Sequence, residues 1–275
     1  MKNTLISLLA CLLITQPIWL NASEDSTTFS VEYGIGLSVI DVPQYAGSNE
    51  SINFALPFPY AVIESDKLKI NREGVRSELF DYNNWSLNLS FAGQLPLDSD
   101  DSNARRGMPD LEWMALAGPA LNYQFVETDS NNVKFSLPLH LAFEFTSESV
   151  NGMGYELAPS VRWEHTIASD DTIWRSILMA TRYYSDEKLN DYYYSVAPQF
   201  ANSERAAYSS ESGLGGYQMM LGITRRHNDI WIGSFFRYRS VSSAVFSDSP
   251  LVKQNYNWYV GVAFAYILGE TEIKI

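Results

Sequence analysis

The chain has 275 residues, of which 32 are acidic and 19 are basic, so its formal net charge is −13. Hydrophobic residues make up 46% of it and aromatic residues 14%, which excludes a chain that stays disordered for lack of apolar side chains. The acidity argues against a nucleic-acid partner, because phosphate contacts need clustered lysines and arginines. The single cysteine, Cys11, excludes a disulfide framework and a thiolate metal site.

Residues 1–22 are typical of a secretory signal peptide. Lys2 supplies a positive charge, and residues 5–20 are mostly apolar. The alternatives are a retained membrane anchor and a lipoprotein signal, since residues 8–11 resemble a lipobox. Pro17 breaks the apolar run, which is also short for a span of ~20 residues and continues past the lipobox. Cleavage after residue 22 is therefore the preferred interpretation.

Beyond this segment the dominant pattern is an alternation of apolar residues with polar or small ones. It runs through residues 29–39, 85–92, 132–145 and 256–266. Such alternation predicts β-strands with one apolar face and one polar or small face. No other segment is long and apolar enough for a transmembrane helix.

These strands are too long for an ordinary soluble sandwich, where ~5–6 residues are typical, whereas a tilted strand that crosses a bilayer needs ~9–11. Their apolar faces begin or end in aromatic residues such as Trp85, Phe145 and Tyr256, where an aromatic girdle would lie. We therefore predict an all-β fold, a transmembrane antiparallel up-and-down β-barrel formed by residues 23–275 as one domain. The alternative is a secreted protein of two β-sheets.

Eleven strands can be placed along the chain, and bacterial single-chain barrels have an even number, so we predict twelve strands with ten as the alternative. The missing strand is expected before residue 95, unless residues 192–200 pair. Long connections should lie outside the cell and short turns in the periplasm. The expected strands are 28–40, 51–63, 67–79, 85–95, 111–125, 132–146, 153–167, 172–184, 213–226, 229–241 and 254–268.

Prolines lie inside several of these strands. Each proline removes one donor from the hydrogen-bond ladder, so a bulge or a local break is expected wherever one occurs. The positions are Pro57, Pro59, Pro119, Pro138 and Pro159.

Four short stretches carry a resemblance to a known family. They are 42–48 (Val-Pro-Gln-Tyr-Ala-Gly-Ser), 56–60 (Leu-Pro-Phe-Pro-Tyr), 191–196 (Asp-Tyr-Tyr-Tyr-Ser-Val) and 247–252 (Ser-Asp-Ser-Pro-Leu-Val). In this order and spacing they resemble the MipA/OmpV family, the MltA-interacting outer-membrane proteins. The resemblance covers essentially the whole mature chain. It departs from outer-membrane proteins of this kind at the C-terminus, where residues 267–275 follow the aromatic segment that usually ends the chain.

The resemblance implies an outer-membrane barrel of a Gram-negative bacterium. The founding role of the family is that of a scaffold, which brings a murein lytic transglycosylase to a murein-polymerising penicillin-binding protein. Other members are described as adhesins or as porin-like proteins.

The histidines give no sign of an enzyme or a metal site. His140, His165 and His227 have separations that match no zinc spacing, and no nucleophile, base and acid fall close together in the predicted strands. No nucleotide or phosphate motif is present either. We therefore predict a protein that is not an enzyme and has no cofactor.

An acidic run, with Asp98, Asp100, Asp101 and Asn103, has oxygen ligands of the kind that Ca²⁺ takes. The glycine and glutamate of an EF-hand are missing, so a solvated loop is preferred, with Arg105 and the next arginine as pairing partners.

Charged and polar residues on the small or polar strand faces should point into the barrel. Opposite charges there predict a pairing network that fills the interior, with an ion-selecting channel as the alternative. The predicted lumen set is Glu112, Lys134, His140, Glu144, Glu156, Arg162, Glu164, Arg237 and Arg239.

Two loop motifs are candidates for recognition. Exposed tyrosines supply rigid contact area, so Tyr192, Tyr193 and Tyr194 are a candidate binding platform, with girdle or strand positions as alternatives. The second motif is Asp248, Ser249 and Pro250.

The first functional hypothesis is a non-enzymatic scaffold embedded in outer-membrane lipid, whose periplasmic turns engage a murein lytic transglycosylase and a penicillin-binding protein. The second is a small pore or a surface adhesin, and the third is a membrane-embedded hydrolase.

Overall fold

The computed structural model describes residues 28–64, 68–71 and 74–274, so the predicted signal peptide lies outside the described residues. They form one antiparallel sheet of thirteen strands. The strands are β1 (Thr28–Pro43), β2 (Ser51–Glu64), β3 (Leu68–Asn71), β4 (Gly74–Tyr82), β5 (Trp85–Gln94), β6 (Trp113–Glu127), β7 (Asn131–Phe145), β8 (Val150–Leu157), β9 (Ser160–Ser169), β10 (Thr172–Ser185), β11 (Gly213–His227), β12 (Ile230–Ser240) and β13 (Tyr256–Lys274).

The sheet curls because neighbours in sequence pair with one another and the last strand, β13, pairs with the first, β1. Strands β8 and β9 are two halves of one pass, since both pair with β7 and with β10. The predicted antiparallel up-and-down arrangement is therefore confirmed. The strand expected over 67–79 is instead two, the short β3 and β4, so the additional strand lies before residue 95, as predicted.

The barrel is not closed between β2 and β5. The ladder from β2 to β3 consists of only two pairs, Ile63 with Ile70 and Glu64 with Lys69, and the rest of β2 pairs with β1 alone. Pro57 and Pro59 lie in that stretch. They break nothing in the β1 ladder, contrary to the expected bulge, because a proline is tolerated where its nitrogen faces an unpaired edge.

Two of the other prolines interrupt the sheet, whereas Pro138 of β7 stays paired with Ala120 of β6. Pro159 separates β8 from β9, which divides the strand expected over 153–167. Between β6 and β7 the pairing skips from Ala117 to Ala120, at the position of Pro119. Both observations confirm the predicted local breaks, which follow from the missing backbone donor.

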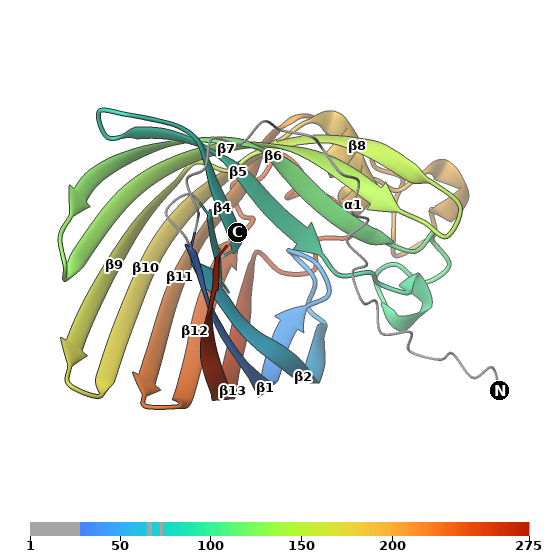
Figure 1. Ribbon diagram of the computed structural model, residues 1–275. Helices are drawn as coiled ribbons and strands as arrows, with labels where there is room; N and C mark the ends of the chain where they lie inside the picture. The colour runs from blue at the N-terminus through green and yellow to red at the C-terminus, as the bar shows by residue number, and fades with distance from the viewer. Residues whose placement is uncertain (1–27, 65–67, 72–73, 275) are drawn as a thin grey trace.

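The two ends of the barrel differ in the length of their connections. Two-residue turns join β4 to β5, β9 to β10 and β11 to β12, and Asn83, Asn84 and Asn228 adopt the positive φ angles that such hairpins require. The opposite end carries the long connections, including the helix α1 (Glu187–Tyr194) and the short 3₁₀ turns Ser99–Asp101 and Pro198–Phe200. Figure 1 shows the hairpins of β9–β10 and β11–β12 at one end and α1 at the other. We call these the turn end and the loop end.

The alternation of the sequence becomes an outside and an inside. On β13, the side chains of Trp258, Val260, Val262 and Phe264 are exposed on the outer face, while Gly261 and Ala265 are buried on the inner face. A continuous outer surface of large apolar side chains is the surface that a bilayer covers. Among the described residues, no helix is long and apolar enough to span a membrane.

The break at Pro119 depends on a glycine. A Cβ added to Gly118 would lie 1.9 Å from the carbonyl oxygen of Leu139, so β6 and β7 approach here more closely than any side chain allows. Gly118→Ala should destabilise the barrel by about 1–3 kcal/mol, the usual range for overpacking. Urea unfolding of the reconstituted protein measures this.

Gly152→Ala on β8 is the matched control, because a Cβ there meets no atom within 4 Å. Its effect should stay within about 0.5 kcal/mol. Equal effects of the two variants would contradict the close approach of β6 and β7.

Candidate functional site

The interior of the barrel contains two cavities, one above the other. The cavity toward the turn end has a volume of about 520 Å³, and the cavity toward the loop end about 700 Å³. Ile177 and Met220 line both, so these two side chains mark the level where the cavities meet.

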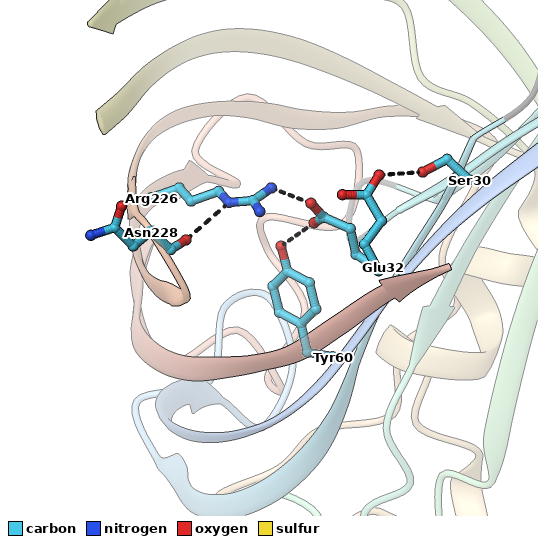
Figure 2. A network of polar contacts seen from close by, with 6 residues as sticks. Ser30, Glu32, Tyr60, Arg226 and Asn228 are labelled. Atoms are coloured by element: carbon cyan, nitrogen blue, oxygen red, sulfur yellow. Dashed lines mark hydrogen bonds and ion pairs between the residues drawn. The ribbon is translucent and has the colours of Figure 1, made fainter. Parts of the chain in front are cut away.

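A polar network crosses the lumen at the turn end, as Figure 2 shows. The guanidinium of Arg226 on β11 pairs with the carboxylate of Glu32 on β1, and the hydroxyl of Tyr60 on β2 donates to the same carboxylate at 3.2 Å. Next to it, the Ser30 hydroxyl donates to Glu270 at 2.8 Å. The buried ring of Tyr60 also packs edge-on against Trp231 at 6.2 Å. The network thus ties β1, β2 and β11 across the interior.

A second ion-pair group lies on β9 and β10. Glu164 binds two arginines, Arg162 at 2.7 Å and Arg175 at 2.9 Å. Lys134 on β7 lies opposite Arg162 in the register. The Glu164 carboxylate is thus shared by two arginines.

The loop-end cavity holds arginines in a different environment. Arg237 and Arg239 project inward from β12 and are held by aromatic rings rather than by carboxylates. The guanidinium of Arg239 lies 4.1 Å from the ring centre of Tyr183, and that of Arg237 lies 5.2 Å from the ring centre of Tyr259. Glu156 lines the same cavity, but no ion pair joins it to either arginine among the described residues.

A cap of four loop-end segments covers the mouth of the barrel: residues 44–50, 95–112, 186–212 and 241–255. Most of its buried apolar side chains pack into one cluster with Met114, Leu116 and Ala142, which point inward from β6 and β7, and Ala104, Val196 and Leu251 form a second, smaller cluster. Tyr194 of α1 stacks on Phe246 with ring centres 3.6 Å apart. The cap therefore has a core of its own, and this core continues into the lumen.

Two buried arginines hold the cap segments together. Arg105 donates to the backbone carbonyls of Tyr193 at 3.0 Å and Pro109 at 3.2 Å. Arg205 donates to the carbonyls of Ala104 at 2.9 Å and Phe200 at 3.1 Å. Both side chains satisfy carbonyls of loops that have no ladder partners, which is what buried backbone groups require.

The predicted recognition motifs lie in this cap. The tyrosine run forms part of α1, not of a strand or a girdle, and Tyr193 and Tyr194 are buried. These two rings are therefore core residues of the cap and offer no exposed platform, while Tyr192 is half-buried and its hydroxyl accepts the backbone N–H of Glu112 at 2.7 Å. Ser249 is also buried, with its hydroxyl donating to the carbonyl of Tyr194 at 2.6 Å. Beside it, Asp248 is exposed and Pro250 is half-buried.

The predicted lumen set is only partly brought together. Glu112 precedes β6 at the mouth, not on a strand face. Glu144 accepts from Asn151 at 3.1 Å near the loop end. His140 is buried and lies 2.9 Å from the Ser90 hydroxyl. The remaining members divide between the ion-pair group on β9 and the loop-end cavity, so the interior holds separate clusters instead of one network.

The acidic run folds on itself. The Asp98 carboxylate accepts the backbone N–H of Asp100 at 2.9 Å, and Arg105 turns to carbonyls instead of the predicted acids. No group of three or more potential metal ligands occurs in the described part of the chain. His165 stacks on Trp163, and His227 lies 2.7 Å from the Thr172 hydroxyl, so neither meets a nucleophile and an acid in a catalytic arrangement.

Sequence reasoning did not find the residues that connect distant segments. Glu32 and Arg226 are 194 positions apart, and Arg105 and Arg205 lie in loops without periodicity. For Glu32 a signal existed, because it lies on the polar face of an alternating strand. For Arg105 and Arg205 no such signal existed.

Comparison with known proteins identifies the family of the chain. A family model described as MltA-interacting protein MipA matches residues 35–268. The chain belongs to this family. It is an outer-membrane β-barrel protein, as the family and the apolar outer surface indicate.

Other comparisons add little beyond the fold. A search of characterised proteins by sequence finds no match. Among solved structures, the chain is similar to a bacterial polysaccharide outer membrane secretin (11% identity, 87% of this chain and 98% of that one, TM-score 0.40). It is also similar to an outer membrane channel from Pseudomonas putida F1 (10%, 92% and 100%, 0.38) and to the outer membrane protease OmpT from Escherichia coli (8%, 93% and 99%, 0.30).

The pair Glu32–Arg226 gives a test of the turn-end network. Glu32→Gln and Arg226→Gln should each lower the free energy of unfolding by on the order of 2 kcal/mol, because each leaves a half-buried partner without its counter-charge. The double variant should lose clearly less than the sum, since both charges are then gone. Urea unfolding of all four proteins measures this coupling, and strict additivity would contradict the pair.

The cap tyrosines give a pH test. Burial raises the pKa of Tyr45 to about 12, and its hydroxyl donates to the carbonyl of Leu251 at 2.8 Å. A raised pKa means that the folded cap favours the neutral ring, so this stabilisation is complete below pH ~10, the unfolded value, and is lost between there and pH ~12.

Tyrosinate absorbance of the protein and of Tyr45→Phe, recorded against pH, should differ by one group that titrates near pH 12. A difference that titrates near the ordinary value of 10 would show Tyr45 to be open to solvent.

Proposed function

We propose that the protein is a non-enzymatic scaffold of the outer membrane, whose turn end docks a murein lytic transglycosylase and a penicillin-binding protein. The family description, MltA-interacting protein, supports a partner of the first kind. The scaffold needs an exposed, fixed surface on the periplasmic side, and short turns of outer-membrane barrels lie on that side.

The observation that carries the proposal is the acidic rim of the turn end. Its exposed carboxylates come from three turns that follow different strands: Glu127, Asp129, Asp170, Asp171 and Asp229. The described turns 83–84, 128–130, 170–171 and 228–229 contain no lysine or arginine. A rim of one charge favours a partner with a basic face, because complementary charge speeds encounter and fixes orientation.

The rim is also rigid. The backbone N–H of Asn228 donates to the carbonyl of Asp171 at 3.1 Å, which joins two neighbouring turns. The carbonyl of Asp229 accepts the N–H of Ile267 at 2.8 Å, which joins the second turn to β13. A surface fixed in this way loses little conformational entropy when a partner binds.

A pore or an adhesin is the second candidate function. The cap with its own core at the loop end argues against a wide channel and presents a structured outer surface instead. In the part of the chain that the structure describes, no catalytic arrangement supports the hydrolase alternative.

Site-specific crosslinking tests the scaffold. A photoreactive residue at Asp170 or Asp229 of the full-length protein, in intact envelopes, should capture a lytic transglycosylase or a penicillin-binding protein. The same residue at Glu148, which is exposed in the loop-end hairpin, is the control and should capture neither.

Removing the rim charges gives the quantitative form of this test. With the photoreactive residue at Asp229, Asp170→Asn/Asp171→Asn should reduce capture several-fold at low salt and have less effect at high salt, where exposed charges are screened. Glu148→Gln should leave capture unchanged. Capture from Glu148 alone, or none from any position, would overturn the scaffold.

A further inference from the structure

Among the described residues, the lining of the loop-end cavity has more positive than negative side chains. Its lining contains three arginines and one carboxylate, Glu156. Arg162 is bound by Glu164 on its own strand. This leaves Arg237 and Arg239 against Glu156, so the cavity keeps a net positive charge even with that carboxylate ionised.

The two arginines of β12 have hydrogen-bond donors to spare. No carboxylate lies within ion-pair distance of either among the described residues. The Nε atoms of both are buried and have no hydrogen-bond partner. Each guanidinium lies over the face of a tyrosine ring, Arg239 over Tyr183 and Arg237 over Tyr259. Stacking of this kind leaves the donors at the edge of each guanidinium free for a planar oxyanion.

The remaining wall of the cavity is mixed, with the amide groups of Gln44, Gln94, Asn190 and Gln218 beside apolar side chains. Its apolar side chains include Ile177, Met179, Leu189, Met220 and Phe246. The volume of about 700 Å³ falls in the range of small-molecule sites, where an apolar wall holds the body of a ligand and a few polar groups orient it. Arginines on one side of the cavity and apolar side chains on the other favour a molecule with a charged head and an apolar body.

We propose that the loop-end cavity is a binding site for an amphiphilic organic anion, whose carboxylate or phosphate head is held by Arg237 and Arg239. The apolar chain or ring of the ligand packs on the methionine and aromatic side chains. Tyr183 and Tyr259 fix the two guanidiniums by stacking. This site lies inside the barrel, away from the acidic rim, so it is independent of the scaffold function and its failure would leave that function untouched.

Binding of two probes to the full-length protein in phosphatidylcholine nanodiscs tests the site. The probes are 2-naphthoate, an aromatic carboxylate, and decanoate, a lipid-derived one, measured by equilibrium dialysis against protein-free nanodiscs. Saturable binding of at least one is expected, and the tighter probe assigns the ligand to the aromatic or the lipid-derived class. The neutral analogue 2-naphthalenemethanol should bind about tenfold or more weakly, because it lacks the charge.

The variants separate charge from folding. Arg237→Gln/Arg239→Gln should weaken binding about tenfold or more, while Arg237→Lys/Arg239→Lys, which keeps both charges, should retain part of it. Arg182→Gln is the matched control, because Arg182 is exposed on β10. Heat-modifiable mobility in gels confirms that each variant is folded. Saturable binding of neither probe, or equal binding by the folded glutamine variant, would overturn the proposal.

Discussion

Backbone hydrogen bonding without water is the constraint on which the rest of this structure depends. In the hydrocarbon layer each N–H and C=O needs a partner within the protein, and a curled antiparallel ladder supplies it. The ladder also imposes the alternation of faces, which places apolar side chains toward lipid and the arginines and glutamates toward the lumen. The seam between β2 and β5 is the place where this ladder stops. Pro57 and Pro59 remove two donors there, which lowers the number of groups left without a partner.

The interior stabilises its cations in three different ways. At the turn end Arg226 meets the carboxylate of Glu32, deeper in the lumen Arg239 lies against the ring of Tyr183, and in the cap Arg105 meets backbone carbonyls. Only the first arrangement neutralises charge. Positive charge that is stacked but not neutralised remains available to a ligand, which is why the same residue type is structural at one end of the lumen and a binding group at the other.

The features of the fold that depend on local periodicity could be predicted from the sequence. Period-two alternation is visible in a single strand, so the outer faces and most strand positions were correct, as at 256–266. Pro159 was correctly read as a break, since a missing donor is a local property. The cap was not predicted, because α1 is eight residues long and its tyrosines give no helical or strand period. The predictions for Tyr193 and Tyr194 were a binding platform, a girdle or strand positions, and only packing against distant segments such as Phe246 shows that they are core residues.

The links through Arg105 and Arg205 affect how the cap responds to acid and salt. Guanidinium groups keep their charge at any physiological pH, and backbone carbonyls do not titrate at all. These links therefore persist in acid, where a latch made of carboxylate pairs would protonate and open. They are also buried, so dissolved salt screens them weakly. These two links thus hold through swings of acidity and salinity, whereas the bond from Asn103 to the Glu50 carboxylate is the kind of cap contact that acid weakens.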